Sequence, residues 1–309
     1  MALTLVEASK RNSGNVLRSA VIETYARSSD ILRVLPFETI NGGGVRYDQE
    51  HTLPGIGFRN VNGSYPESTG TVNPQFDPTV IAGGDLDVDK YILATRGANT
   101  RTTQEEMKVK ALAHRWSLAF VKGDSTTGSG EFDGIQIRLR GTQVIDNGAT
   151  SNGDALSIAK LDQLIDAVDN PTHLFMTKAM RRILTAAARN PAVGGYITYA
   201  RDEFGRQVTL YNDLPLLIAD QNGDAYASIG FNETNPGGGT TTGSSVYCLS
   251  IGPGMIEGIQ NSDPMVVDLG ELETKPALRT RVEWYAGIAC YHPRAGGRLR
   301  GIKDAAAVA

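Results

Sequence analysis

Cysteine and histidine are scarce in this sequence of 309 residues, which contains two cysteines and four histidines. Cys248 and Cys290 form neither a disulfide framework nor a zinc-binding pattern, so we expect a protein of a reducing cytosol. The histidines lack the spacing of metal ligands; they are His51, His114, His173 and His292. The phosphate-binding pattern Gly-Lys-Ser/Thr is also absent. We therefore predict no metal site and no cofactor.

Long apolar runs and a strong net charge are missing too. No run approaches the roughly 20 apolar residues of a membrane span, and residues 1–14 lack the apolar core of a signal peptide. The net charge of −4 argues against a dedicated nucleic-acid binder, because such proteins carry a basic domain or stripe. The sequence therefore indicates a soluble protein made in the cytosol, with enough residues for one large or two medium domains.

What the sequence has instead is a long polar segment, residues 41–89, without a helical pattern. Its many glycines and prolines break any helical period. Apolar residues are spread along it, which disagrees with disorder, and we predict a long twisted β-hairpin. Arms of roughly 18 residues reach about 60 Å, and a two-stranded ribbon is at best marginally stable alone in water. We infer that something outside the subunit supports the hairpin, which indicates assembly.

Residues 102–122 carry the clearest helical pattern of the chain. Thr102 is a good N-cap with Glu105 at the third position, and Gly123 is a natural C-terminal stop. Apolar residues recur between them at helical spacing. At 1.5 Å per residue the helix is close to 30 Å long, and we expect one of its faces to lie on a sheet.

The remaining elements are predicted from apolar spacing and turn residues. Helices are expected at residues 15–27, 157–168 and 178–189. Strands are expected at residues 37–40, 132–139, 142–146, 173–176, 196–199, 207–210, 214–219, 226–229, 246–251, 265–268 and 278–290. Residues 232–245 have the Gly, Thr and Ser composition of a flexible loop.

Two short patterns resemble known sites, but simple turns explain both better. Residues 123–128 contain the Gly-Asp-Ser block of one esterase family, whose chemistry needs a late Asp-x-x-His. The last histidine, His292, has Ala289 at the position of that Asp. The glycine-rich segment 252–258 follows a strand as a dinucleotide loop does, but residues 261–264 stop the chain before a full helix. We predict that the protein is not an enzyme, and an α/β hydrolytic enzyme with an unrecognised site is the alternative of another class.

Several strings carry a resemblance to a known family. FVKGD (120–124) with FDGI (132–135) looks like a turn after a long helix that leads into a Gly-Ile strand start. GRQVTLYNDLP (205–215) looks like a hairpin and its edge, and RVEWYAG (281–287) with PRAGGRLRGI (293–302) like a closing strand and tail. Together with the order of elements, these strings resemble the major capsid protein of tailed bacteriophages, the Hong Kong 97-type fold. The resemblance covers essentially the whole chain.

The resemblance implies an α+β fold in four parts. These are an N-terminal arm (1–40), an extended β-hairpin loop (41–92), a peripheral domain with a long spine helix (93–150 and 264–309), and an α/β axial domain (151–263). The function it implies is self-assembly, as pentamers and hexamers, into the icosahedral shell of a virion, made in the cytoplasm of the bacterial host. Such a shell encloses double-stranded DNA without sequence-specific binding. An encapsulin-type compartment is the alternative.

The resemblance also implies partners. These are a portal protein, decoration proteins and a scaffold. Family members with scaffolding in the same chain begin with a long helical segment that is later cleaved. Here the arm begins almost at Met1, so we expect a separate scaffold or none.

Contacts between subunits are expected from the hairpin. The candidate residues are Arg46, Ile56, Phe58, Arg59, Val61 and Tyr65. Some family members join subunits by an isopeptide bond from a lysine of the extended loop, but residues 41–89 contain no lysine. We therefore expect no covalent cross-link. On the long helix, Lys108, Lys110 and Arg115 are most simply a solvated face, with contact to a neighbouring subunit as the sharper alternative.

Overall fold

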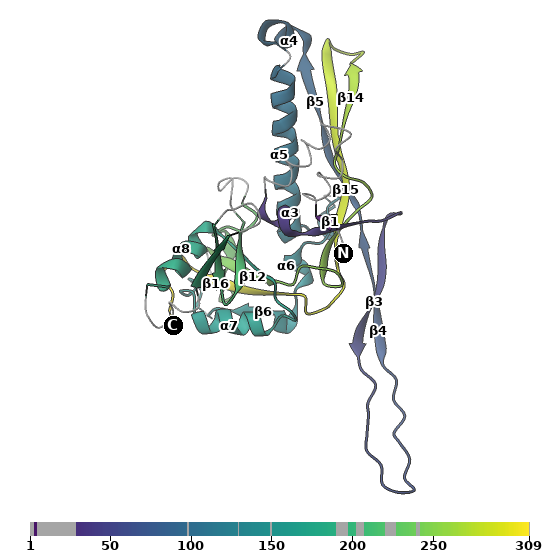
Figure 1. Ribbon diagram of the computed structural model, residues 1–309, viewed down its shortest axis with the longest axis vertical. Helices are drawn as coiled ribbons and strands as arrows, with labels where there is room; N and C mark the ends of the chain where they lie inside the picture. The colour runs from purple at the N-terminus through teal and green to yellow at the C-terminus, as the bar shows by residue number, and fades with distance from the viewer. Residues whose placement is uncertain are drawn as a thin grey trace.

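The computed structural model describes residues 3–4, 29–97, 99–128, 130–148, 150–189, 197–201, 207–219, 227–238 and 242–308. Figure 1 shows a long helix beside three long strands, a two-stranded ribbon that extends in the opposite direction, and a lobe of helices and strands at one side. The predicted α+β fold is confirmed, with an extended hairpin, a long helix and a mixed lobe.

The first sheet has six strands and is organised around β15 (Ala277–Cys290). The N-terminal half of β15 lies between β5 (Val80–Asp89) and β14 (Met265–Glu271), and both pairings are antiparallel. The other strands, in order away from the C-terminal half of β15, are β13 (Ile256–Gln260), β2 (Pro36–Thr39) and β1 (Leu3–Thr4). The sheet therefore joins residues from both ends of the chain.

The long helix α5 (Asn99–Lys122) packs on this sheet and agrees with the predicted helix to within three residues. Trp116 lies at the centre of an aromatic cluster. Its ring centroid is 5.5 to 5.8 Å from those of Phe37, Phe120, Phe132 and Trp284. Large buried aromatic side chains each contribute several kcal/mol to a core. Two short helices flank these elements, α3 (Asp30–Val34) before β2 and α4 (Lys90–Arg96) before α5.

The lobe is built on an eight-stranded sheet with its own apolar core. Its strands are β6 (Val144–Asp146), β7 (His173–Met176), β8 (Ile197–Arg201), β9 (Gln207–Tyr211), β10 (Leu214–Ile218), β11 (Glu233–Thr234), β12 (Thr242–Leu249) and β16 (Gly296–Ile302). Its helices are α7 (Ile158–Asp166) and α8 (Lys178–Ala187). The side chains of Leu161, Leu164, Met180 and Leu184 are fully buried, because both helices are amphipathic.

The ribbon consists of β3 (Gly44–Thr52) and β4 (Thr71–Pro78) in an antiparallel pair. Residues 53–70 connect the two strands as an irregular tip. Figure 1 shows this tip at the opposite end of the molecule from α4. The predicted hairpin is therefore confirmed for residues 44–78, although its paired strands are shorter than predicted and end well before the tip. Residues 80–89, which the prediction included in the hairpin, form β5 and pair with β15 instead.

Three predicted local elements are wrong or incomplete. Residues 132–139 form an irregular segment and the one-turn helix α6 (Ile135–Arg138) instead of a strand, because the Gly134 carbonyl accepts hydrogen bonds from the next turn. Residues 227–229, the described part of another predicted strand, are not a strand. The predicted loop 232–245 contains β11 and the start of β12. Short 3-10 turns lie at Ser125–Thr127 and Gly141–Gln143.

The sheets also divide the chain differently from the predicted boundaries. β16 falls in the predicted peripheral range 264–309 but pairs with β6 and β12 in the lobe. β13 falls in the predicted axial range 151–263 but pairs with β15 and β2. These pairings join strands far apart in the sequence, which a local pattern does not reveal. The predicted helix over residues 15–27 lies outside the described residues.

Candidate functional site

The tip of the ribbon exposes the apolar side chains predicted for contacts between subunits. The exposed fraction is 95% for Ile56, 91% for Val61 and 64% for Tyr65, and Phe58 is fully exposed. Each such side chain gains about 1.5–3 kcal/mol when it is buried. Several of them close together on an unsupported loop form a surface that gains free energy from a partner.

The two predicted arginines lie against aromatic rings of the same ribbon. The guanidinium of Arg46 is 5.5 Å from the ring centroid of Phe76, and that of Arg59 is 5.1 Å from the ring of Tyr65. Arg59 also donates a hydrogen bond of 3.3 Å to the Gly63 carbonyl. These contacts order the ribbon surface. Leu53 of the tip and Val72 and Phe76 of β4 are also exposed apolar residues, and they are not among the contact residues predicted from the sequence. The alternation along β4 could have revealed Val72 and Phe76.

The base of the ribbon is attached to the body by a buried carboxylate, Asp77 of β4. The Arg138 guanidinium of α6 lies 2.6 Å from one carboxylate oxygen, and the Tyr47 hydroxyl of β3 lies 2.7 Å from the other. Burial, together with Asp77, raises the pKa of Tyr47, so its hydroxyl keeps its proton and can donate. The cluster joins the ribbon, α6 and β15 at one point.

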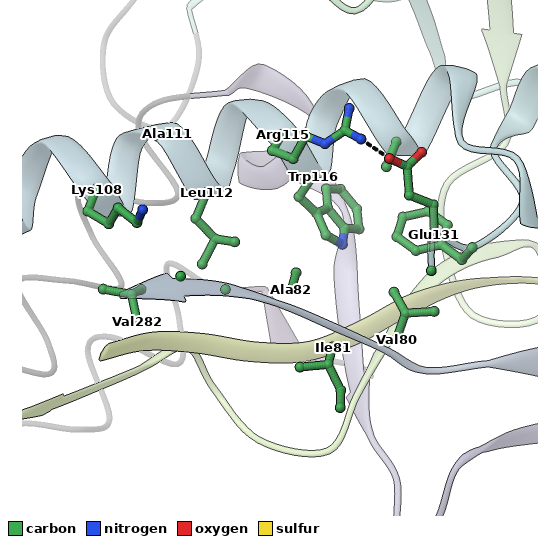
Figure 2. Close-up of a pocket in the computed structure, with 15 residues that line it drawn as sticks. Val80, Ile81, Ala82, Lys108, Ala111, Leu112, Arg115, Trp116, Glu131 and Val282 are labelled. Carbon is green, nitrogen blue, oxygen red and sulfur yellow. Dashed lines mark hydrogen bonds and ion pairs between the residues drawn. The ribbon is translucent and has the colours of Figure 1, made fainter. Parts of the chain in front are cut away.

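A groove of about 340 Å³ lies between α5 and β5 (Figure 2). Its apolar lining includes Leu112 and Val282, and the buried indole N–H of Trp116 has no hydrogen-bond partner among the described residues. The Lys108 side chain packs against Gly84 of β5. A Cβ at Gly84 would lie 2.9 Å from the Lys108 side chain, so glycine leaves room for this contact. The groove therefore offers an apolar surface, while the unsatisfied Trp116 N–H is buried beneath it.

The three basic residues of α5 that were considered from the sequence have different environments. Arg115 forms an ion pair with Glu131 at the rim of the groove (Figure 2). Lys108 also lines the groove, whereas Lys110 is exposed and does not. The solvated-face interpretation fits Lys110, and the other two belong to a surface that a neighbour could contact.

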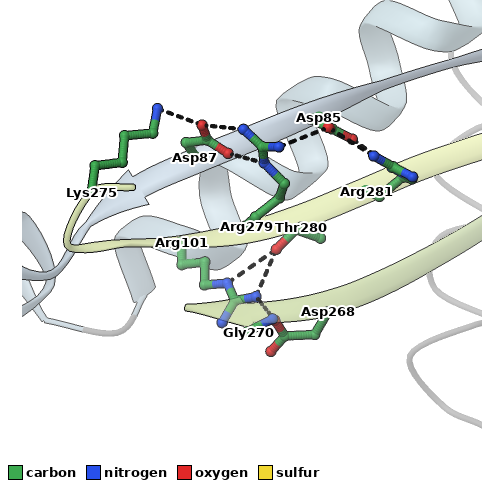
Figure 3. Close-up of polar contacts among 9 residues, drawn as sticks. All are labelled: Asp85, Asp87, Arg101, Asp268, Gly270, Lys275, Arg279, Thr280 and Arg281. Atoms are coloured by element: carbon green, nitrogen blue, oxygen red, sulfur yellow. Dashed lines mark hydrogen bonds and ion pairs between the residues drawn. The ribbon is translucent and has the colours of Figure 1, made fainter. Parts of the chain in front are cut away.

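The strands beside α5 carry a ladder of paired charges (Figure 3). Arg279 contacts Asp87 at 2.7 Å, and Arg281 contacts Asp85 at 2.7 Å. Hydrogen bonds from Arg279 and then Lys275 hold the pKa of Asp87 well below its usual range. These carboxylates therefore stay ionised, and most of this charge is neutralised within the subunit.

The patterns that resemble catalytic sites form turns. The Asp124 carboxylate accepts a 2.8 Å hydrogen bond from the backbone N–H of Thr126, and Asp133 accepts one from the N–H of Ser125. At the glycine-rich segment, the N–H of Met255 donates to the Gly252 carbonyl, and β13 starts at once. The prediction of a tight turn there is confirmed.

No cluster of three or more His, Cys, Asp or Glu side chains among the described residues could hold a metal ion. No helix in this part of the chain combines the length and the apolarity needed to cross a membrane.

Comparison with known proteins shows which solved structures have a similar fold. The sequence matches no protein-family model and no curated protein. The structure is similar to the capsid of a native GTA particle, with a TM-score of 0.63 and 14% identity, over 89% of this chain and 91% of the other. It is also similar to an encapsulin, SrpI of Synechococcus elongatus, with a TM-score of 0.62 and 15% identity, over 90% and 89% of the two chains. A protein of Mycobacterium phage Bobi matches with a TM-score of 0.61 and 11% identity, over 88% and 89%.

Proposed function

We propose that this chain, which has the Hong Kong 97-type fold, is the major capsid protein of a tailed bacteriophage. It assembles with copies of itself, as pentamers and hexamers, into an icosahedral shell that encloses double-stranded DNA. The exposed apolar residues of the ribbon tip carry the proposal, because the single subunit leaves them uncovered. The fold of the chain, which is similar to that of a GTA capsid, supports the same conclusion. An apolar tip far from its own core fits a protein that is complete only in an assembly.

The tip residues Ile56, Phe58, Val61 and Tyr65 dock on an adjacent copy of the chain. The groove between α5 and β5 is the docking site that we propose for them, because its lining includes apolar side chains such as Leu112 and Val282. Figure 1 shows that the ribbon extends away from α5, which lines the groove, so the tip and the groove of one copy do not meet. Arg46 and Arg59 hold the ribbon aromatics in place for this contact.

The parts of the subunit then take the roles that the fold family implies. The lobe is the axial domain at the centres of pentamers and hexamers, the α5 region is the peripheral domain, and residues 1–40 are the arm. A portal protein and decoration proteins are further partners, together with a separate scaffold or none. The shell is a virion component made in the cytoplasm of the bacterial host.

An encapsulin-type compartment is the second candidate, because SrpI matches this structure about as well as the GTA capsid does. The contents of the shell distinguish the two. Shells purified from the native context and treated with nuclease should retain protected double-stranded DNA of genome length in the first case. A protein cargo without protected DNA would favour the compartment. The named proteins of like fold are shell proteins, which favours a structural role over the hydrolytic enzyme.

The contact of the tip is tested by replacing Phe58 and Val61 with serine. This double variant should remain a folded, soluble subunit, because neither side chain packs in the core, but it should form few or no shells. Glu67→Gln is the matched control, since it changes the charge of the same tip without removing apolar surface, and it should assemble normally. Shells of wild-type stability from the Phe58/Val61 variant would contradict the docking of the tip.

A further inference from the structure

One carboxylate at the base of the ribbon brings together groups from three separate elements. Asp77 is the second-last residue of β4, and it is only 5% exposed. Its Oδ1 accepts from Arg138 Nη1 of α6 at 2.6 Å. Its Oδ2 lies 2.7 Å from the Tyr47 hydroxyl of β3 and 3.2 Å from the backbone nitrogen of Cys290 in β15. The ribbon is thus bound to the body where it leaves it.

The groups that bind Asp77 are themselves held in place. Arg138 donates through Nε to the Asp133 carbonyl at 2.8 Å and through Nη2 to the Ile288 carbonyl at 3.4 Å. The single hydroxyl hydrogen of Tyr47 has two acceptors, Asp77 and the Cys290 carbonyl at 2.8 Å, and the charged carboxylate is the stronger one. Arg138 is therefore fixed to the body, whereas the Tyr47 hydroxyl binds Asp77 within the ribbon.

A second set of contacts acts beside the carboxylate. Gln49 Nε2 donates to the Cys290 carbonyl at 2.9 Å. The rings of Tyr47 and Tyr291 meet edge to face, with centroids 4.9 Å apart. All these contacts lie within a few residues of the joint, so they govern how the ribbon leaves the body.

On the β3 side, the backbone at the joint gives little stiffness of its own. The chain runs there through three consecutive glycines, the last of which begins β3, and Gly42 and Gly44 have φ of 127° and 155°. Such values are strained for other residues, and glycine passes easily between conformations. The Thr79 N–H donates to the Gly43 carbonyl at 3.1 Å, which only extends the pairing of β3 with β4. On the β4 side, Thr79 alone separates β4 from β5, which pairs with β15, so the ribbon is attached through the backbone at one strand and the side-chain contacts fix its direction.

A small change in the direction of the ribbon at its base causes a large displacement of its tip. The chain covers about 50 Å from the base to the tip at 3.3 Å per residue, so a swing of about 10° moves the tip by roughly 9 Å, or two strand spacings. A displacement of that size would remove the tip from any specific site. A buried ion pair contributes little net stability, because its desolvation offsets its attraction, and such pairs are often explained by the specificity that they give.

We infer that Asp77 is a positioning residue that fixes the direction of the β3–β4 ribbon relative to the body, so that the tip arrives at its site on the neighbouring subunit. Arg138 and Tyr47 complete this anchor. The inference rests on the proposed shell function for its effect on assembly. The fixed direction itself is a property of the single subunit, so it can be tested without shells.

The two cysteines provide a local readout. Cys290 lies under the anchor, and Cys248 is fully buried in the lobe. Burial raises the pKa of Cys290 to about 11 and that of Cys248 to about 12, so both thiols react slowly near pH 8. Cys290 is partly exposed, so its labelling rate in the wild type is the baseline for the variants. The ratio of their labelling rates therefore separates opening of the ribbon base from general unfolding.

The experiment compares Asp77→Asn with Asp48→Asn in the unassembled subunit, using a maleimide reagent. Asp48 is an exposed carboxylate of β3, so its variant is the matched control. Asp77→Asn should raise the labelling rate of Cys290 by about tenfold and leave that of Cys248 unchanged, because local opening becomes easier and because the Asp77 charge no longer helps to raise the pKa of Cys290. Tyr47→Phe keeps the Asp77 charge, so its effect on Cys290 reports opening alone. It should also reduce the yield of shells by at least about tenfold, whereas the control behaves like the wild type.

Tyr47→Phe serves as a second variant that keeps the ion pair of Asp77 and Arg138. This variant should raise the labelling rate of Cys290 but not that of Cys248. It therefore tests the anchor even if Asp77→Asn does not fold. Wild-type labelling of Cys290 in every soluble variant would overturn the inference, as would equal acceleration at both cysteines. If the wild type itself forms no shells, the proposed function fails, while the labelling ratio still tests the anchor.

Discussion

Arg298 and Glu233 form an ion pair inside the lobe, with 2.7 Å between the guanidinium and the carboxylate and less than 10% of either side chain exposed. Arg298 lies on β16 and Glu233 on β11, so the pair connects the strand near the C-terminus to a segment that the sequence predicts to be a loop. Arg298 also donates to Ser245 at 3.1 Å and lies over the ring of Tyr247. The segment is therefore part of the folded core at this point.

Glu233→Gln should destabilise the subunit. It leaves the buried guanidinium of Arg298 without its counter-charge, and removing one partner of a buried pair costs about 3–5 kcal/mol. Arg300→Gln is the control, because the ion pair of Arg300 with Asp146 is much more exposed and should contribute less than about 1 kcal/mol. Urea denaturation of the unassembled subunits measures both. Equal small losses in the two variants would contradict the role given to the buried pair.

A short peptide inserted between Gly238 and Gly239 should leave assembly intact. Gly238 has φ of 74° and open space around it, as expected of an exposed turn. The same insertion between Thr234 and Asn235 should reduce soluble protein strongly, because Asn235 and Glu233 are buried. Expression yield and shell formation of the two insertions are compared with the wild type. Loss of soluble protein from the first insertion would show that the turn is packed against another surface.

The stability of the subunit should fall as the pH drops below about 6.5, in part because of His173. Burial, and then the positive charge of Arg33, lower the pKa of His173 to about 4. The unfolded chain takes up a proton near pH 6.5, and the folded protein accepts it only near pH 4, so stability is lost across this window. The contribution of His173 between pH 7 and pH 5 is on the order of 2 kcal/mol.

His173→Gln removes this proton uptake. Unfolding free energies at pH 7 and pH 5, measured by urea denaturation, should therefore differ less in the variant than in the wild type. Carboxylates titrate in both proteins and cancel in the comparison. Identical pH dependence of the two proteins would show that His173 titrates normally in the folded state.

The shell should be held without covalent bonds between subunits. Residues 41–89 contain no lysine, and Arg46 and Arg59 stay protonated, so the ribbon lacks an amine nucleophile. Lys90, the first residue of α4, forms an ion pair with Glu271. Boiled particles on a reducing denaturing gel should give one band near the 33.1 kDa monomer. A ladder of dimers, pentamers and hexamers that survives boiling would contradict this prediction.

The elements with strong local signals were predictable from the sequence. The spacing of Val109, Leu112, Trp116 and Phe120 predicts α5, and the glycine and proline content of residues 41–89 excludes a helix there. Residues 132–139 were not predictable in the same way. Ile135, Ile137 and Leu139 alternate as in a strand, but the turn at Gly134 and the packing of Ile135 and Leu139 in the core give one turn of helix.

The candidate site was predictable only in part. The apolar tip residues stand out in a polar segment, whereas Asp77 is one carboxylate among many polar residues of the ribbon. Its partners Arg138 and Cys290 are 61 and 213 residues away, and only the folded chain brings them together. The groove beside Trp116 depends likewise on the pairing of β5 with β15.

Electron microscopy of particles purified from the native context tests the central claim most directly. The shell function predicts closed icosahedral particles whose walls contain this chain in pentamers and hexamers, with ribbons that cross onto neighbouring subunits. Size-exclusion chromatography of the same material should show a large assembly and little free subunit. A stable, monodisperse monomer under these conditions, with no closed particles, would contradict the account.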